Sequence, residues 1–363
     1  MLKTLRILVK AFARNLFYSL VSLIRRKDTL ILYSASKNDL YRNISSLAEA
    51  LTQRGIPYTL LSYQELLEHT YASLAVLAKA KVLVIDASSP AAFVRLSSKT
   101  CLINCWHACG AYKKIAFDAK RKDCDAKAED RRIARIHRCI AYFICTSKHT
   151  AEVYARAFRL RPKQMKVFGS PRMDALLERG RVLEREGYRP ETILYAPTFR
   201  TKDGKRCMPK IPDAFALAHA LEQSGISARF AIRCHPSLDK SCAAQGWEDW
   251  SLLPEAEALE RAALLITDYS SIFFDFLAFH RPFLFYVPDL SAYQANEREL
   301  YFSPADVFPD VTCTDSLSLA QTIVRLYGKR LTYPDFWEKH MGACDGHSTE
   351  RVCDCIVSCL RKT

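Results

Sequence analysis

Two adjacent serines follow an apolar strand-like run near residue 270, and this placement suits a phosphate site. The run at residues 265–267 leads into Asp268, Tyr269, Ser270 and Ser271, and apolar residues then continue to residue 276. The first backbone N–H groups of a helix lack an intrahelical partner and carry the positive end of the helix dipole, so hydroxyls placed there extend an anion cradle. We therefore predict a diphosphate site. The alternative is that Asp268 or Ser270 is only an N-cap.

Two neighbouring strand-like runs also end in groups that bind anions. Residues 192–195 lead to Pro197, Thr198 and Arg200, and residues 229–232 lead to Arg233 and His235. A guanidinium group is a planar fork that matches phosphate oxygens. Because ligands of open α/β sheets bind beyond the carboxyl ends of the strands, these groups are predicted to lie near the serines. Arg281 follows the serine-bearing helix and is placed in the same site.

The first half of the chain offers one candidate proton acceptor. His107 comes directly after the apolar run 102–105, and an imidazole accepts a proton at neutral pH. Lys113 and Lys114 lie shortly after it and are suited to an acidic acceptor. Arg172 lies in a Gly-Ser-Pro-Arg turn. A purely structural role for a single histidine is the alternative.

Short apolar runs alternate with helical stretches along most of the chain. The strand-like runs lie at residues 30–33, 58–61, 81–85, 102–105, 141–145, 165–168, 192–195, 229–232, 264–267 and 283–286. Continuous apolar runs separated by helices are typical of parallel sheets covered on both faces. With 363 residues and a charged break near residues 179–190, we predict two doubly wound α/β domains, residues 28–185 and 186–363.

Residues 1–27 contain Lys and Arg but no acid, and the remaining positions are largely apolar. The longest uncharged run, residues 15–24, is shorter than the roughly 20 residues that span a bilayer. We therefore predict an amphipathic basic helix lying in the interface of an anionic membrane. A basic helix that only packs on the first domain is the alternative.

The chain carries a formal net charge of +14 and 14 cysteines. Its charge suits an acidic partner, but we see no nucleic-acid module and predict no nucleic-acid binding. The cysteines lack the spacing of a zinc site, and we expect reduced thiols buried as small apolar groups in a cytosolic protein. No carboxylate cluster indicates a metal, so no metal or other cofactor is predicted.

Several motifs together resemble, in order, the CDP-glycerol glycerophosphotransferase family, which builds teichoic acids and related capsular poly(alditol phosphates). They are Trp106-His107 with the following lysines, the segment 169–174, the segment 195–200, Arg233-Cys234-His235-Pro236, and Asp268-Tyr269-Ser270-Ser271 with Asp275 and Arg281-Pro282. The similarity covers about residues 100–310. One departure is Ala108-Cys109, where the family usually has Gly-Thr.

The resemblance implies a GT-B-like fold with the nucleotide donor held by the carboxy-terminal domain. By position, His107 is similar to the family's catalytic base and His235 to its second essential histidine. The implied donor-binding residues are Arg172, Thr198, Arg200, Arg233, Asp268, Ser270, Ser271 and Arg281, and the expected acceptor-binding residues are Lys113 and Lys114.

The implied reaction is transfer of an alditol phosphate, glycerol phosphate first among them, from a CDP-alditol donor to a hydroxyl of a lipid-linked or polymeric glycan, with release of CMP. The expected location is peripheral, on the cytoplasmic face of the cell membrane, and a homo-oligomer is compatible with the sequence. Two alternatives remain: a GT-B glycosyltransferase of surface polysaccharides that uses a nucleotide sugar, and a non-catalytic membrane scaffold or nucleic-acid binder.

Overall fold

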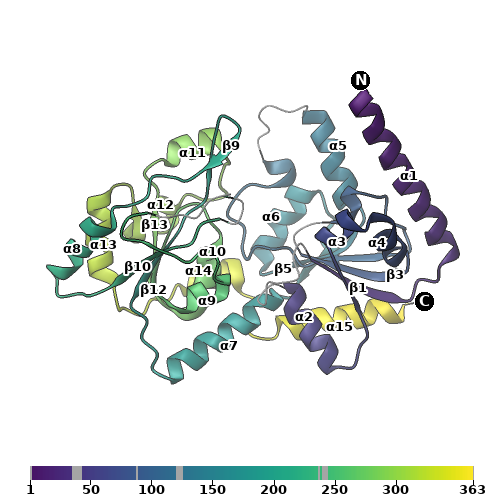
Figure 1. The fold of residues 1–363 in the computed structure, drawn as a ribbon. Coiled ribbons are helices and arrows are strands. Elements are labelled where there is room, and N and C mark those ends of the chain that lie inside the picture. The colour runs from purple at the N-terminus through teal and green to yellow at the C-terminus, as the bar shows by residue number, and fades with distance from the viewer. Residues whose placement is uncertain are drawn as a thin grey trace. The chain divides into compact units, whose positions relative to one another are not determined.

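The computed structural model describes residues 2–34, 43–86, 89–119, 126–235, 238 and 244–362, with side chains from residue 9 onward. The chain divides into two compact units, which Figure 1 shows with their elements labelled. The first unit comprises Met1–Cys109, Ala116–Ala175 and Phe336–Thr363, and the second comprises Gly110–Ile115 and Leu176–Asp335.

The first unit is built on a six-stranded sheet of order β2-β1-β3-β4-β5-β6. All neighbouring strands pair in parallel, as the continuous apolar runs predicted. The strands are β1 (Thr29–Ser34), β2 (Thr59–Ser62), β3 (Ala80–Ile85), β4 (Cys101–Asn104), β5 (Ile140–Cys145) and β6 (Met165–Val167). Their carboxyl ends therefore meet at one edge.

Helices cover this sheet and include the end of the chain. They are α1 (Leu2–Ile24), α2 (Asn43–Gln53), α3 (Tyr63–Glu68), α4 (Thr70–Leu77), η1 (Pro90–Ala92), η2 (Ala116–Asp118), α5 (Ala126–His137), α6 (Lys148–Phe158), η3 (Pro162–Gln164), α14 (Pro334–Met341) and α15 (Ser348–Arg361). Helix α7 (Pro171–Arg185) crosses from the first unit to the second.

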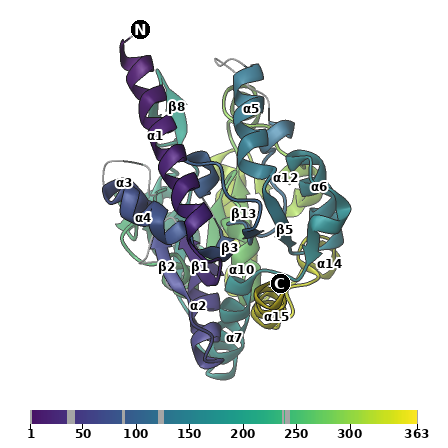
Figure 2. The ribbon, with the colours of Figure 1, turned by 90° about the vertical axis from the view of Figure 1, so that its right-hand side faces the viewer.

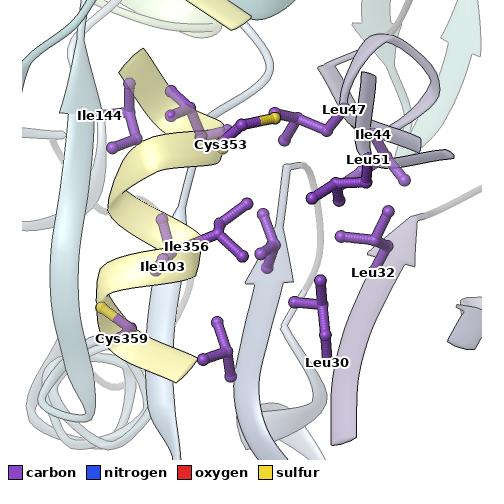
Figure 3. Packing of buried hydrophobic residues seen from close by; sticks show 14 residues of the cluster. Leu30, Leu32, Ile44, Leu47, Leu51, Ile103, Ile144, Cys353, Ile356 and Cys359 are labelled. Atoms are coloured by element: carbon purple, nitrogen blue, oxygen red, sulfur yellow. The ribbon is translucent and has the colours of Figure 1, made fainter. Parts of the chain in front are cut away.

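One face of the first sheet is closed by α2 and by the carboxy-terminal helix α15. Figure 3 shows Ile356 of α15 directed toward the strands that carry Leu30 and Leu32, and Leu30, Ile103, Ile356 and Cys359 are all buried in this cluster. Burial of an aliphatic side chain of this kind stabilises a fold by roughly 1.5–3 kcal/mol. Cys353 and Cys359 belong to this apolar cluster, as expected for thiols that act as small hydrophobic groups.

The amino-terminal helix α1 packs against α4, where the rings of Phe17 and Tyr71 meet edge to face at 5.1 Å. Figure 2 shows α1 running beside the helices that follow β2. Within the described residues, no helix combines the length and apolarity needed to cross a membrane.

The second unit repeats the same design. Its main sheet has the order β11-β10-β7-β12-β13-β14, and all of its strands are parallel. The strands are β7 (Thr192–Ala196), β10 (Arg229–Ile232), β11 (Glu248–Asp249), β12 (Ala262–Thr267), β13 (Phe283–Tyr286) and β14 (Thr312–Cys313). An antiparallel pair, β8 (Arg200–Lys202) and β9 (Lys205–Cys207), projects after β7.

The helices of the second unit are mostly short. They are α8 (Ala214–Glu222), α9 (Glu255–Glu260), α10 (Ile272–Phe276), η4 (Leu277–Phe279), α11 (Leu290–Asn296), α12 (Pro304–Val307), η5 (Pro309–Val311) and α13 (Ser316–Leu326). The core of this unit is rich in aromatic rings, including Phe273, Phe283 and Phe285, all fully buried.

The bounds of the two units differ from the predicted division at residue 185. Residues 336–363 return to the first unit, because the apolar face of α15 completes the core against β1 and α2. Residues 110–115 join the second unit, although both flanking segments belong to the first. Both exchanges depend on contacts between residues far apart in sequence, which local periodicity does not encode.

Candidate functional site

Four neighbouring strands of the second unit deliver polar groups at their carboxyl ends. Thr198 follows β7, His235 follows β10, Asp268 follows β12 and Asp289 follows β13. These strands are adjacent in the order β10-β7-β12-β13. The sequence predicted Thr198, His235 and Asp268 at this edge of the sheet, whereas Asp289 was not among the predicted site residues.

Asp268 is the organising carboxylate of this edge. It is fully buried, and its Oδ1 accepts a hydrogen bond from the backbone N–H of Thr198 at 2.8 Å. Its Oδ2 lies 3.0 Å from Nη1 of Arg200. Burial raises the pKa of Asp268, while the charge of Arg200 and the Thr198 N–H oppose that rise. Asp268 thus ties the end of β12 to the loop after β7.

Arg200 is held by carboxylates on two strand ends. Its Nε and Nη2 donate to the two carboxylate oxygens of Asp289 at 2.7 and 3.1 Å, and its Nη1 donates to the carbonyl of Thr198 at 2.7 Å. The guanidinium also lies over the rings of Tyr269 and Tyr293, at 4.9 and 5.0 Å. These partners take most of its N–H groups, so the geometry favours a positioning role over a freely available phosphate ligand.

The segment that follows His107 is part of this site in the second unit. The backbone of Tyr112 and Lys114 pairs with Tyr301 and Glu299, at 2.7 and 2.9 Å. The Tyr112 hydroxyl donates to the carbonyl of Asp268 at 3.2 Å. Gly110 has a φ of 64°, and a Cβ there would overlap the ring of Phe274. Close packing on α10 therefore requires glycine at this position.

Lys113 lies in the same electrostatic environment as Asp268 and Arg200. Burial lowers the pKa of Lys113 to about 8, with Arg298 and Arg200 lowering it further and Asp268 and Glu297 opposing them. Lys114 forms an ion pair with Glu299 at 3.3 Å. Both lysines were predicted to hold the acceptor, but the structure places them in the unit that carries the predicted donor site.

The two serines directly precede a short helix that ends at residue 276, where the apolar run of the sequence ends. Helix α10 spans only Ile272–Phe276, and Ser271 is its N-cap without a side-chain capping bond. The Ser270 hydroxyl accepts from the N–H of Ile272 at 3.3 Å. Both serines are half-buried. A helix of this length has a weak dipole, so the hydroxyls and backbone N–H groups are the relevant anion donors here.

The loop after β10 carries the second candidate histidine. His235 is exposed, and its ring meets that of Phe199 edge to face at 5.0 Å. Partial removal of water lowers the pKa of His235, and the charges of Lys113 and Arg206 lower it further. Cys234 is disulfide-bonded, so the expectation of reduced thiols fails at this position.

Two of the predicted donor residues in this unit make structural contacts. Arg233 is mostly buried, with its Nη1 3.8 Å from a carboxylate oxygen of Glu255. Arg281 lies at the start of β13, and its Nη1 donates to the carbonyls of Glu260 and Ala262 at 2.6 and 2.9 Å. Since Ala262 begins β12, Arg281 is at the amino ends of the strands and is not brought together with Asp268. Sequence proximity to α10 was therefore misleading.

His107 lies in the first unit, at the carboxyl end of β4. It is exposed, and its ring packs at 4.3 Å against that of Trp106. Trp106 has a φ of 54°, an unfavourable conformation for a side chain of this size. Its indole ring also packs against Phe143 and Phe158, at 5.9 and 5.1 Å. The surrounding core therefore compensates for the strain that turns His107 outward.

A buried asparagine that the sequence did not single out fixes this turn. Asn43 is 1% exposed; its Nδ2 donates to the carbonyl of Trp106 at 2.5 Å. Its Oδ1 accepts from the Ser170 hydroxyl at 2.9 Å and from the backbone N–H of Arg172 at 3.2 Å. One amide thus connects the His107 turn to the predicted Gly-Ser-Pro-Arg turn. Arg172 belongs to the first unit, apart from the other predicted donor residues.

The structure therefore sorts the predicted residues into two groups. Thr198, Arg200, Asp268, Ser270 and Ser271 are brought to one edge of the second sheet, with Arg233 and His235 on the next strand end. His107 and Arg172 lie in the first unit. Within the described part of the chain, no group of three or more His, Cys, Asp or Glu side chains is arranged to hold a metal ion.

Comparison with known proteins agrees with this arrangement of sheets and strand ends. The teichoic acid ribitol-phosphate primase of Bacillus spizizenii is 28% identical over 363 residues, covering 92% of each chain. The teichoic acid glycerol-phosphate primase of Bacillus subtilis is 27% identical over 72% of this chain and 69% of its own length. The wall teichoic acid polymerase TagF has a similar fold, with a TM-score of 0.78 at 19% identity over 99% of this chain and 97% of the other.

A protein-family model described as CDP-Glycerol:Poly(glycerophosphate) glycerophosphotransferase matches residues 16–358. This match covers both units and all of the strand ends described above. It confirms the resemblance seen in the separate motifs and favours alditol-phosphate transfer over glycosyl transfer. The chain is a transferase that belongs to the CDP-glycerol:poly(glycerophosphate) glycerophosphotransferase family.

Proposed function

We propose that this enzyme transfers an alditol phosphate, with glycerol phosphate as the first candidate, from a CDP-alditol to a hydroxyl of a membrane-linked glycan or teichoic-acid-like acceptor. The acceptor oxygen attacks the β-phosphorus of the donor. The bond from that phosphorus to the bridging oxygen breaks, and CMP leaves with the electron pair. The observation that carries the proposal is the group formed by Lys113, His235 and the two serines at the carboxyl edge of the second sheet, in a chain of this family.

Lys113, His235, Ser270 and Ser271 are the proposed donor-phosphate ligands. Lys113 is the lysine among these four residues, and burial lowers the pKa of its amine to about 8. Arg200 and Asp268 hold the loops that carry these ligands, since they bind each other and Asp289. Phosphoryl transfer depends mainly on positioning and on neutralising phosphate charge, and this cluster offers both.

His107 is the proposed general base, which takes the proton from the attacking hydroxyl. Its exposure and its place on a rigid turn support this role. A base must lie within hydrogen-bond reach of its proton, and the bond from Asn43 to Trp106 restricts where the imidazole can point. Asn43 and Arg172 support that turn from the same unit.

We further propose that the enzyme works on the cytoplasmic face of the membrane, at an anionic lipid surface. Phe12, Leu16 and Leu20 of α1 are 69%, 49% and 52% exposed, at spacings that share one helix face. Large apolar side chains gathered on one exposed face are typical of an interfacial helix. Arg25, Arg26 and Lys27 follow the helix and suit the lipid headgroups.

The decisive experiment incubates purified enzyme with CDP-glycerol or CDP-ribitol and a lipid-linked glycan acceptor. We expect CMP release coupled to a new phosphodiester in the product, identified by mass spectrometry. Both alditols are tested because the primases compared above are named for ribitol phosphate and glycerol phosphate, respectively. Transfer of a sugar from a nucleotide sugar, or no CMP release with either donor, would overturn the proposal.

A further inference from the structure

A cavity lined by basic residues lies in the first unit, away from His107. It has a volume of about 1000 Å³ and lies between the end of α1, the loop before β4 and the end of α5. Thr100 and Cys139 line it, directly before β4 and β5. The cavity is therefore at the amino edge of the first sheet, whereas His107 follows the carboxyl end of β4.

Among the described residues that line this cavity there is no Asp or Glu. Seven of the lining residues are basic: Arg25, Arg26, Lys27, Arg95, Lys99, Arg135 and Arg138. Arg95 and Arg138 are exposed, and neither forms an ion pair with any part of the chain that the structure describes. Partial burial lowers the pKa of Lys27, and the charge of Lys99 lowers it further. The cavity therefore has a positive potential that a bound anion would relieve.

The walls of the cavity are held in place by hydrogen bonds from α1. Asn15 Oδ1 accepts from the backbone N–H of Arg95 at 2.8 Å, and the Tyr18 hydroxyl accepts from that of Ser97 at 3.2 Å. Lys27 donates to Ser22 at 2.8 Å and to the carbonyl of Ala78. The basic side chains thus surround a preformed frame, and binding does not have to order the loop first.

An apolar stripe on α1 leads directly to this cavity. Leu16, Leu20 and Leu23 lie along one face of the helix, and Leu23 is 83% exposed and lines the cavity. A soluble phosphate would use the basic groups and leave the stripe in water. An anionic lipid uses both, because its phosphate meets the cations while its acyl region accepts the leucines.

We propose that this cavity binds the phosphate headgroup of an anionic phospholipid and fixes how the first unit lies on the membrane. The proposal rests on the membrane association proposed above and adds a defined headgroup site at the amino edge of the sheet. It assigns no role in phosphoryl transfer to these residues. Lipid binding and CMP release can therefore be measured separately.

The test is co-sedimentation of the full chain with vesicles of phosphatidylcholine, with and without phosphatidylglycerol. We expect binding only with phosphatidylglycerol, and the variant Arg95→Ala/Arg138→Ala should weaken it by about 25-fold, since each basic residue near an anionic surface contributes ~1 kcal/mol, or about fivefold. The matched control Lys148→Ala/Lys163→Ala removes two exposed cations of the same unit outside the cavity, and it should weaken binding much less.

A second readout locates the lipid directly. Acetylation of lysines, followed by mass spectrometry, should show that phosphatidylglycerol vesicles protect Lys99 but not Lys163. Equal losses of affinity in the two double variants, equal binding to both vesicle types, or unprotected Lys99 would each overturn the headgroup site. In detergent, the Arg95→Ala/Arg138→Ala variant should release CMP as fast as the wild type does. A loss of lipid binding can then be distinguished from a loss of the proposed transfer reaction.

Discussion

The side-chain amide of Asn43 donates to the backbone carbonyl of Trp106 at 2.5 Å, one residue before His107. The same amide accepts from Ser170 and from the backbone of Arg172. Because Trp106 has a positive φ, its carbonyl must be held for the turn to persist. Asn43 is therefore a positioning residue for His107. A substitution of Asn43 changes the orientation of the His107 turn but leaves the imidazole itself in place.

Asn43→Asp should lower kcat by about 100-fold with little change in the affinity for the CDP-alditol, because a misplaced base costs about that much. The carboxylate still accepts from Ser170 and Arg172 but repels the Trp106 carbonyl. Gln164→Ala is the matched control, since Gln164 is also a buried amide of the first unit, bonded to Ile140. The Gln164→Ala variant should be less stable than the wild type but should keep the wild-type kcat. Steady-state kinetics and urea unfolding distinguish the two effects, and an unchanged kcat in Asn43→Asp would contradict the positioning role.

His107→Ala should lower turnover by about 10²- to 10⁴-fold, the usual contribution of a general base. Binding of the CDP-alditol should remain, because the proposed donor ligands lie in the second unit. Calorimetric titration measures the binding and CMP release measures the turnover. His347→Ala, at an exposed position of the same unit, serves as the control. Turnover near that of the wild type would eliminate His107 as the base.

Lys113 predicts a pH dependence of donor binding. Its pKa is lowered to about 8 in the free protein, and a bound diphosphate would raise it. The protonated amine is the form that binds, so affinity should fall as the pH rises through about 8. His235 does not interfere, because its pKa is lowered from the ordinary histidine value and it is already neutral in this range.

Lys113→Arg is the informative variant, because an arginine remains charged throughout this pH range. Calorimetric titration of CDP-glycerol between pH 7 and 9 should therefore show a decline for the wild type and none for Lys113→Arg. Parallel declines in both proteins would place the titrating group elsewhere.

Asp268→Asn should destabilise the second unit by ~3 kcal/mol, because it removes one partner of a buried ion pair. Asp289→Asn should cost less, since the Asp289 side chain is 36% exposed and solvent screens its interaction with Arg200. Urea unfolding of the two variants and of Arg200→Gln tests this order. A double variant Asp268→Asn/Arg200→Gln should lose less than the sum of the single losses. Strict additivity would argue against coupling through the 3.0 Å contact.

Ser271→Ala should weaken binding of CDP-glycerol by about fivefold, the effect of one hydrogen bond worth ~1 kcal/mol. Its melting temperature should change little, because the Ser271 hydroxyl caps no helix N–H. Ser270→Ala should lose both affinity and some stability, since its hydroxyl accepts from Ile272. Loss of stability without loss of affinity in both variants would leave the serines with a capping role only.

Local patterns in the sequence were sufficient to predict the strands and the polar residues that follow them. An apolar run and the residue after it are neighbours in the chain, so Thr198, His235 and Asp268 could be assigned to strand ends before any contact was known. The same reasoning failed for Arg281, because a residue after a helix lies at the amino edge of the next strand. The pairing of the Lys113 segment with residues 299–301 also lay beyond this reasoning, because those residues are far apart in the sequence.

The sequence by itself determined the fold class, the family and the kind of chemistry, since these follow from periodicity and from short motifs in a set order. Only the tertiary structure decided which side chains act together. Arg200 is satisfied by Asp268 and Asp289, and Asn43 supports the turn of His107, through hydrogen bonds between residues distant in sequence. Such bonds form only when packing removes competing water and fixes both partners, and no local pattern records that outcome.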